Sequence, residues 1–127
     1  MTAIEVRRGD VVLVAFPFVS VGGAERKRRP AVVVQSDRHN RRRAAVILAA
    51  ITGSQKRREL GSKVPVALDS TEGHLAGLRT DSVIDCQTLI TLPRTEIVAR
   101  LGSLPPEVLA RLDRALENAL GLPGHRG

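Results

Sequence analysis

The sequence predicts a mainly β protein with one C-terminal helix, and two features of the residue pattern support this class. Short apolar runs rich in β-branched residues recur between about residue 9 and residue 101, separated by turn-forming or charged segments. The last part of the chain then changes to the spacing of an amphipathic helix. Because 127 residues leave little room for a second core, we expect one domain that spans residues 1–127.

The apolar runs mark the expected strands. They are residues 10–17, 30–36, 44–52, 63–68, 81–86, 87–92 and 97–101. Residues 31–34 and 45–51 are apolar on both faces, so these two strands should be central and covered. Gly22 and Gly23 are expected at the tip of a loop. This set of strands predicts a small barrel to which a helix is added.

The predicted helix covers about residues 105–120. Its apolar residues follow helical spacing and are Val108, Leu112, Ala115, Leu116 and Ala119. Pro105 and Pro106 suit the first turn, and Gly121 with Pro123 ends the helix. We expect the apolar stripe to pack on the barrel. Because such a barrel has few large core side chains, we also expect burial through dimerisation.

Charge and cysteine content narrow the choice of partner and compartment. The formal net charge of +7 points to nucleic acid or to an acidic protein. An anionic membrane would attract it too, but no apolar run reaches the roughly 18 residues that span a bilayer, and a signal-peptide pattern is missing. Cys86 is the single cysteine, so we expect a reducing cytoplasm and a buried, unreactive thiol.

The positive charge is concentrated between residues 26 and 58, which hold eleven of the 20 Lys and Arg residues. They form three clusters, predicted to lie in the connections that flank the strands at 30–36 and 44–52. Only Asp37 opposes them, and such a patch costs stability unless an anion such as phosphate offsets it. Solubility alone is the alternative explanation. The candidate RNA-binding residues are Arg26, Lys27, Arg41, Arg42, Arg43, Lys56, Arg57 and Arg58.

RNA cleavage needs no metal, because the neighbouring 2′-hydroxyl is already the nucleophile if the site holds it in line. Arginine suits the stabilisation of the charged phosphorane, since its planar guanidinium donates two hydrogen bonds to phosphate and stays charged. Arg29 stands just before Pro30 at a predicted strand start, and Thr52 ends the following strand. We expect these two side chains to face one cleft, with Ser54 in the next turn as an accessory candidate.

Other chemistries find less support in the sequence. The three histidines show no metal-ligand spacing, one cysteine does not supply a zinc site, and no phosphate-binding glycine motif is present. We therefore expect neither a metal nor a cofactor. Two Phe residues and no Trp or Tyr leave few aromatic surfaces on which bases could stack.

Six pieces of the sequence, followed by the C-terminal helix, carry a resemblance. In order they are "RRGDVVLVAFP" (7–17), "RRPAVVVQSD" (28–37), "VILAAIT" (46–52), "GLRTDSVID" (77–85), "LITL" (89–92) and "ARLGSL" (99–104). The most specific part is the arginine-proline strand, the strand ending in Thr52, and then G-L-x-x-x-S-V. The sequence resembles the MazF/PemK/Kid family of toxin endoribonucleases from bacterial toxin–antitoxin pairs, over nearly the whole chain.

The resemblance implies an SH3-like barrel of the MazF/CcdB type that dimerises and holds single-stranded RNA in a groove across the dimer. It also implies metal-independent cleavage that leaves a 2′,3′-cyclic phosphate and a 5′-hydroxyl. The family arginine, assigned to acid/base and phosphate-stabilising work, corresponds to Arg29, and the assisting threonine to Thr52. Arg28 takes this role if the alignment shifts by one residue. The expected partner is an acidic antitoxin that competes with RNA for the basic patch.

Departures from the family concern the proton chemistry. Where many relatives carry a carboxylate, then glutamine and arginine, this chain has Gln87, Thr88 and Ile90. Asp85, two residues before Gln87, either replaces the carboxylate or serves structural pairing. Glu25 falls one position away from an acidic residue of many relatives.

Two other functions stay open on sequence alone. The same barrel serves toxins that inhibit DNA gyrase without an enzymatic reaction, and such a toxin needs a protein-binding end rather than Arg29 and Thr52. A plain RNA-binding barrel is the other alternative.

Overall fold

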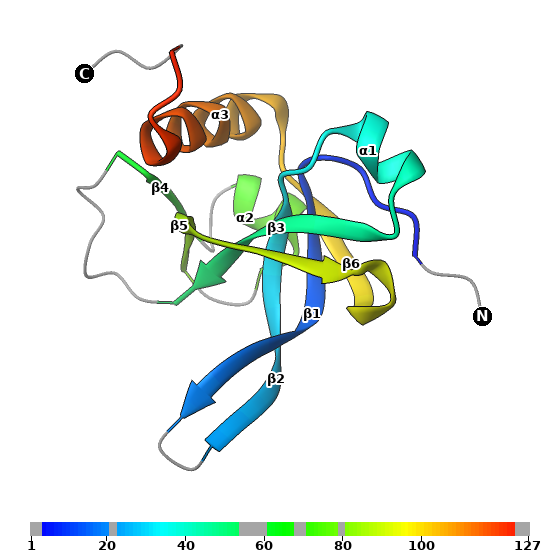
Figure 1. Cartoon of the computed structure of the whole chain (residues 1–127). Helices are drawn as coiled ribbons and strands as arrows, with labels where there is room; N and C mark the ends of the chain where they lie inside the picture. The colour runs from blue at the N-terminus through cyan, green and yellow to red at the C-terminus, as the bar shows by residue number, and fades with distance from the viewer. Residues whose placement is uncertain (1–3, 21–22, 54–60, 68–70, 79–80, 124–127) are drawn as a thin grey trace.

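The computed structural model describes residues 4–20, 23–53, 61–67, 71–78 and 81–123, and within them six strands form one antiparallel sheet (Figure 1). The strands are β1 (Asp10–Ser20), β2 (Gly23–Val33), β3 (Ala45–Thr52), β4 (Lys63–Val66), β5 (Ser82–Pro93) and β6 (Ile97–Ser103). They are accompanied by helices α1 (Asp37–Arg42), α2 (Thr71–Ala76) and α3 (Pro106–Leu120) and the 3₁₀ turn η1 (Arg94–Glu96). The order across the sheet is β4-β5-β3-β2-β1-β6, so β2 and β3 are central as predicted.

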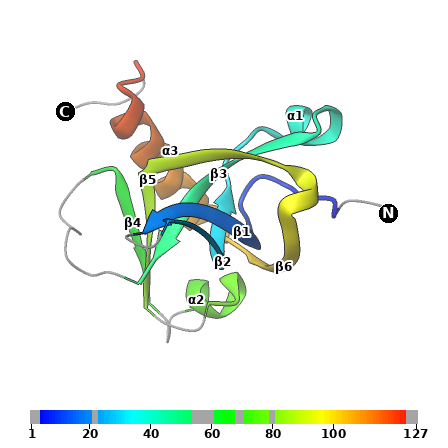
Figure 2. The same cartoon turned by 60° about the horizontal axis from the view of Figure 1, so that its bottom comes forward.

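The sheet is strongly curved and open (Figure 2). Strands β4 and β6 form its two edges, and no strand pairing joins them in the described part of the chain. The predicted small barrel is therefore present as a barrel-like sheet with a C-terminal helix. None of the described helices combines the length and the apolar character that crossing a membrane requires.

Each face of the sheet carries its own apolar core. Helix α3 covers one face, where Ile51 of β3 and Ile84 of β5 pack with Leu112 of the helix. On the opposite face, Val14 of β1 and Leu48 of β3 belong to a second buried cluster. Because successive side chains of a strand point to opposite faces, β2 and β3 contribute to both cores. This explains why their sequences are apolar without alternation.

Helix α3 begins and ends where the residue types require. Pro105 stands at the N-cap and Pro106 at the first helical position, where a missing backbone N–H costs nothing. Gly121 ends the helix with a φ of 68°, and its N–H donates to the carbonyl of Glu117. This left-handed conformation is one that glycine adopts without steric cost.

The prediction that Arg26–Arg29 lie in a connection is wrong, because these residues belong to β2. The β1–β2 pairing runs from Val11↔Val32 to Ser20↔Gly23, and the distal part of this hairpin extends away from the rest of the sheet (Figure 1). An antiparallel pair satisfies its own backbone hydrogen bonds, and long basic side chains keep such a ribbon solvated. Gly23 is accordingly a strand residue, whereas Gly22 lies outside the described residues.

Residues 81–86 and 87–92, predicted as two strands, form the single strand β5. Its pairing with β3 changes from Ala49↔Leu89 to Ala50↔Asp85, so residues 86–88 bulge out of this ladder. A bulge interrupts the period-two alternation of side chains, which is why the sequence pattern indicated a strand boundary at this point.

Helices α1 and α2 were not expected, because each has only six residues and neither shows a readable apolar period. In α1, the Ser36 hydroxyl caps the helix by accepting a hydrogen bond from the N–H of His39 at 3.4 Å. Asn40 is buried and exchanges hydrogen bonds with Gln35, through its Oδ1 at 2.9 Å and its Nδ2 at 3.0 Å. This polar network, rather than apolar packing, ties α1 to the sheet.

Replacing Leu112 by alanine tests the packing of α3. Leu112 is fully buried, so Leu112→Ala should lower the free energy of unfolding by about 2–5 kcal/mol, through lost burial and the cavity left behind. Leu120, on the same helix and 56% exposed, is the matched control, and Leu120→Ala should change stability by less than about 0.5 kcal/mol. Urea unfolding followed by circular dichroism measures both, and equal losses would contradict the packing described.

Candidate functional site: one polar face of the sheet

The strand register aligns four residues across one face of the sheet. Ala31 of β2 pairs with Ala50 of β3, Ala50 pairs with Asp85 of β5, and Asp85 pairs with Lys63 of β4. Directly paired residues of antiparallel strands project to the same face. The face opposite α3 therefore carries a charged pair, Asp85 and Lys63, beyond the apolar cluster that covers its other part.

Thr52 and Arg29 lie on this same face. Thr52 follows Ala50 by two residues and pairs with Val83, while Arg29 precedes Ala31 by two residues and pairs with Val14 of β1. Because side chains alternate along a strand, both project to the Ala31–Ala50 side. The β2–β3 pairing ends at Ala31↔Ala50, so Arg29 and Thr52 each lie two residues beyond the last pair.

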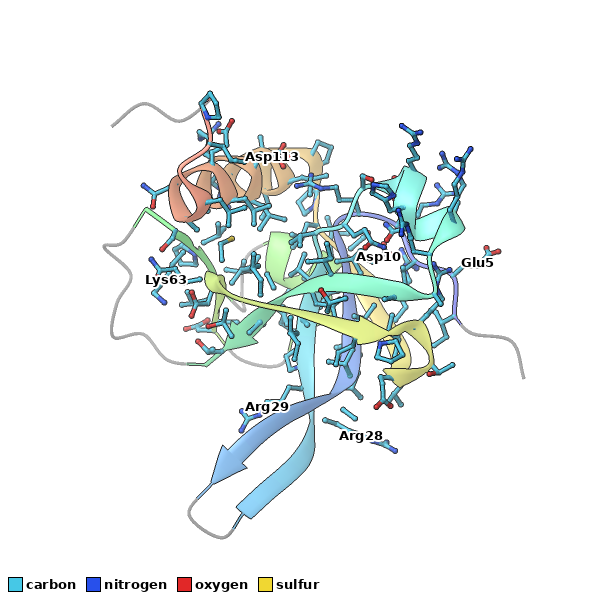
Figure 3. The ribbon with its side chains drawn as sticks, in the orientation of Figure 1. Glu5, Asp10, Arg28, Arg29, Lys63 and Asp113 are labelled. Carbon is cyan, nitrogen blue, oxygen red and sulfur yellow. The ribbon has the colours of Figure 1, made fainter. Side chains whose placement is uncertain are left out.

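Arg29 and Arg28 are both exposed but differ in direction. Figure 3 shows the two side chains on opposite sides of the hairpin, as expected for neighbours in a strand. Arg29 is thus the residue of this pair that shares a face with Thr52, which is half-buried.

Asp85 is a partly buried carboxylate held from three sides. It accepts hydrogen bonds from the backbone N–H of Gln87 and the hydroxyl of Thr88, both at 3.0 Å, and its Oδ1 lies 3.1 Å from Nζ of Lys63. Burial alone raises the pKa of Asp85. The hydrogen bonds from Gln87, Lys63 and Thr88, together with the Lys63 charge, outweigh burial and hold this pKa below its ordinary value.

The hydrogen bonds and the lowered pKa of Asp85 limit the chemical roles that this carboxylate can take. A carboxylate with a lowered pKa and several donors has little tendency to take up a proton at neutral pH, so it is poorly suited to general-base work. Its hydrogen bonds instead fix the bulge, where the exposed Gln87 and Thr88 project beside the Thr52 end of the sheet. Lys63 was missed by sequence reasoning, because nothing in the run "KVPVAL" indicates a partner twenty-two positions further on.

Cys86 occupies the same bulge but faces the core. It is buried against the α3 side, and its N–H donates to the carbonyl of Ser62 at 3.0 Å. Burial, aided by the nearby Asp85 charge, raises the pKa of the Cys86 thiol to about 12. The thiol is thus protonated at neutral pH, which fits the buried, unreactive cysteine that the sequence predicts.

The remaining predicted residues fall into three groups. Glu25, Arg26 and Lys27 lie on the distal part of β2, paired with Phe18, Pro17 and Phe16, and their side chains lie outside the described residues. Ser54, Lys56, Arg57 and Arg58 lie outside the described residues altogether. Arg41 and Arg42 are in α1, and Arg43 is its C-cap.

The α1 cluster does not join the cluster of β2. Helix α1 connects the end of β2 to the start of β3, whereas Thr52 ends β3 and Arg29 lies within β2, two residues beyond its last pair with β3. Figure 1 shows α1 and the β1–β2 hairpin at opposite ends of the molecule. Among the described residues, the arginines of β2 and those of α1 therefore lie on separate surfaces.

A cavity of about 910 Å³ lies beside α1, away from Arg29 and Thr52. Its polar lining includes Asp10, Asp37, Arg41 and Arg100. Asp10 is nearly completely buried, accepts a hydrogen bond from the N–H of Arg7 at 2.8 Å and pairs with Nε of Arg100 at 3.3 Å. Asp10 and Asp37 already have partners here, since Asp37 accepts hydrogen bonds from the N–H of Arg8 and from Asn40, so the cavity is a structural junction and does not include Arg29 or Thr52. In the described part of the chain, no three His, Cys, Asp or Glu side chains gather as a metal site.

Comparison with known proteins identifies the family. Residues 7–120 match the family described as the PemK-like, MazF-like toxin of type II toxin–antitoxin systems. The chain belongs to this family. The match covers every strand from β1 to β6 and the whole of α3.

Solved MazF/PemK-type structures agree with the fold. An endoribonuclease in complex with its cognate antitoxin from a mycobacterial species is 25% identical, with a TM-score of 0.72 over 93% of this chain and 97% of that chain. The Mycobacterium tuberculosis toxin MazF-mt6 is 23% identical, with a TM-score of 0.69 over 89% and 97%. MazF in a MazE–MazF complex from Deinococcus radiodurans is 21% identical, with a TM-score of 0.69 over 94% and 99%.

The Asp85–Lys63 pair leads to a prediction about stability and pH. Since folding lowers the pKa of Asp85, its contribution to stability is present above the pKa of the unfolded chain, about 4, and is lost as pH falls through the folded value. Asp85→Asn should therefore destabilise the protein by about 1–3 kcal/mol at pH 7 and by much less at pH 3. Urea unfolding at both pH values measures this, and an equal loss at both would contradict the ion-pair role. Glu5→Gln, which removes an exposed carboxylate outside β5, is the control.

Proposed function

We propose that this MazF/PemK-family chain is a sequence-selective endoribonuclease toxin that cleaves single-stranded RNA. The proposed cleavage needs no metal and leaves a 2′,3′-cyclic phosphate and a 5′-hydroxyl. The observation that supports it most is the register, which assigns Arg29 and Thr52 to one face and one end of the β2–β3 pair. The family match and a similar chain named as an endoribonuclease supply the reaction class.

Arg29 is proposed to stabilise the phosphorane. The 2′-hydroxyl gives up its proton as its oxygen attacks the phosphorus, negative charge builds on the non-bridging oxygens, and the 5′-oxygen takes up a proton as its bond to phosphorus breaks. A guanidinium stays charged at any physiological pH and presents two parallel N–H groups to such oxygens. On an exposed strand with a proline immediately after it, Arg29 has a backbone whose direction is restricted.

Thr52 is proposed to orient the phosphate from the neighbouring strand. Its hydroxyl can donate one hydrogen bond to a non-bridging oxygen, and its half-buried position at the end of β3 restricts its rotation. Gln87 and Thr88, exposed on the bulge of β5, are suited to contact the bases on either side, because amide and hydroxyl groups both donate and accept.

The partners follow from the same proposal. A site with few aromatic side chains and many cations attracts a polyanion, and an acidic antitoxin segment can occupy the same surface in place of RNA. Similar chains have been solved with their antitoxins. We further propose a homodimer in the cytoplasm, with RNA in a groove that both subunits line.

Three substitutions test the site together. Arg29→Ala should reduce cleavage of single-stranded RNA by about 10²–10³-fold, and Thr52→Ala by about 10–100-fold, because each removes a donor to the developing charge. Arg28→Ala is the matched control, since it removes the same charge from the neighbouring position on the opposite side of the hairpin. Cleavage is measured on gels in the presence of EDTA, with circular dichroism to confirm folding.

Each alternative outcome has a distinct meaning. If Arg28→Ala abolishes cleavage and Arg29→Ala does not, the register assignment of the site is wrong. RNA binding without cleavage would indicate a plain RNA-binding protein, and inhibition of DNA gyrase without cleavage would indicate a non-enzymatic toxin. Cleavage that disappears with EDTA and returns with a divalent cation would contradict the metal-independent mechanism.

A further inference from the structure

Helix α1 presents a second arginine surface that the proposed cleavage site does not use. Arg38, Arg41 and Arg42 are spaced by three and four residues, so they lie on one side of the helix, and all three are exposed. Arg43 follows as the exposed C-cap. The opposite side of the helix carries the buried Asn40. We name the surface of Arg38, Arg41, Arg42 and Arg43 the α1 arginine face.

In the described part of the chain, the one internal effect that the structure shows for these charges is that of Arg41, which helps to hold the pKa of Asp37 below its ordinary value. Within the described residues, no ion pair or hydrogen bond engages the guanidinium of any of the four. The acid closest in sequence, Asp37, is taken by the N–H of Arg8 at 2.7 Å and by Nδ2 of Asn40 at 3.2 Å.

Other arginines in this half of the molecule have definite internal partners. Arg8 lies 2.7 Å from Asp113 of α3, and Arg100 pairs with Asp10. Arg94 donates from Nη2 to the carbonyls of Asn40 and Arg43, so the C-terminal end of α1 is already capped. The α1 arginine face is thus distinguished by exposed like charges at spacings that repel each other on a helix.

We propose that the α1 arginine face binds the phosphodiester backbone of RNA outside the cleavage site. This inference rests on the proposed function, because it takes the bound RNA to be the substrate. Guanidinium groups match phosphate oxygens in charge and geometry, and backbone phosphate contacts account for much of the affinity of proteins for nucleic acids. Neutralisation by phosphate would also offset the repulsion along α1.

The chemistry of the surface favours RNA over a protein partner. Protein interfaces are centred on buried apolar or aromatic anchors. Among the described residues, the large exposed apolar side chains belong to β3, α2, β6 and the end of α3, and none belongs to α1. A surface of guanidinium groups without an apolar anchor is typical of nucleic-acid recognition.

The position of the surface determines which substrates are affected. Within one subunit, the α1 arginine face lies where α1 joins β2 to β3, whereas Arg29 lies beyond the far end of the β2–β3 pairing, so a short oligonucleotide that fills the cleavage site does not reach α1 of that subunit. A longer RNA contacts both. The α1 arginine face therefore strengthens the binding of long RNA, and the rate of the chemical step does not depend on it.

The experiment compares two substrates and matched variants. The substrates are the shortest oligonucleotide that the protein cleaves and the same sequence within a long RNA. The combined change Arg38→Gln, Arg41→Gln and Arg42→Gln should raise KM for the long RNA by roughly ten- to a hundredfold and leave kcat unchanged. KM and kcat for the oligonucleotide should stay within about twofold, because no phosphate contact is lost there. The salt dependence of log Kd for the long RNA should become shallower by about 2, as expected for three lost contacts to single-stranded RNA.

A pair of single charge reversals distinguishes RNA binding at a defined site from general attraction by the net charge of the protein. Arg42→Glu and Arg114→Glu change the net charge equally, and Arg114 is exposed on α3. Only Arg42→Glu should weaken the binding of long RNA. Equal weakening by both, or equal loss of cleavage on both substrates in the triple variant, would overturn the proposal. Binding of long RNA is also measured without turnover by filter retention, so loss of the α1 contact is detected even if the chain proves not to cleave RNA.

Discussion

The antiparallel register of β2, β3 and β5 is the constraint on which the candidate site depends. The pairs Ala31↔Ala50 and Ala50↔Asp85 place the apolar side chains of β2 and β3 in the two cores. The same pairs set the faces of Arg29 and Thr52, two residues further along. A shift of one residue would exchange the faces of a whole strand and expose one core, so the packing that stabilises the fold also fixes the faces to which the Arg29 and Thr52 side chains project.

A second constraint acts inside β5, where the bulge redirects three residues. Asp85, held by Lys63 and by donors from Gln87 and Thr88, anchors the bulge and keeps Cys86 in the core. The partly buried ion pair is thus a positioning device rather than a source of proton transfer. Gln87 and Thr88 remain exposed on the bulge beside this carboxylate.

In the described part of the chain, the basic clusters of β2 and α1 lie in different parts of the structure, although they are close together in the sequence. The cluster in β2 belongs to the β1–β2 hairpin, whereas the cluster in α1 lies at the opposite end of the molecule (Figure 1). Between them, arginines such as Arg8 and Arg94 serve the fold by bonding to Asp113 and to backbone carbonyls. Arginine content alone therefore does not measure the extent of a nucleic-acid surface. In the described part of the chain, the guanidinium groups of α1 differ from those of Arg8 and Arg94 in having no internal acceptor.

The sequence by itself determined the mainly β class, the central place of β2 and β3 and the extent of α3, because these depend on local periodicity and on Pro and Gly at the helix ends. It also singled out Arg29 and Thr52 as candidates. Only the tertiary structure decided that Arg26–Arg29 form a strand, that residues 86–88 bulge and that Lys63 meets Asp85. Helix α1 likewise depends on a buried polar network and on capping by Arg94 from a distant turn. The physical reason is common to all of these: strand pairing and ion pairing join residues far apart in the chain, and no local pattern encodes which distant partner is met.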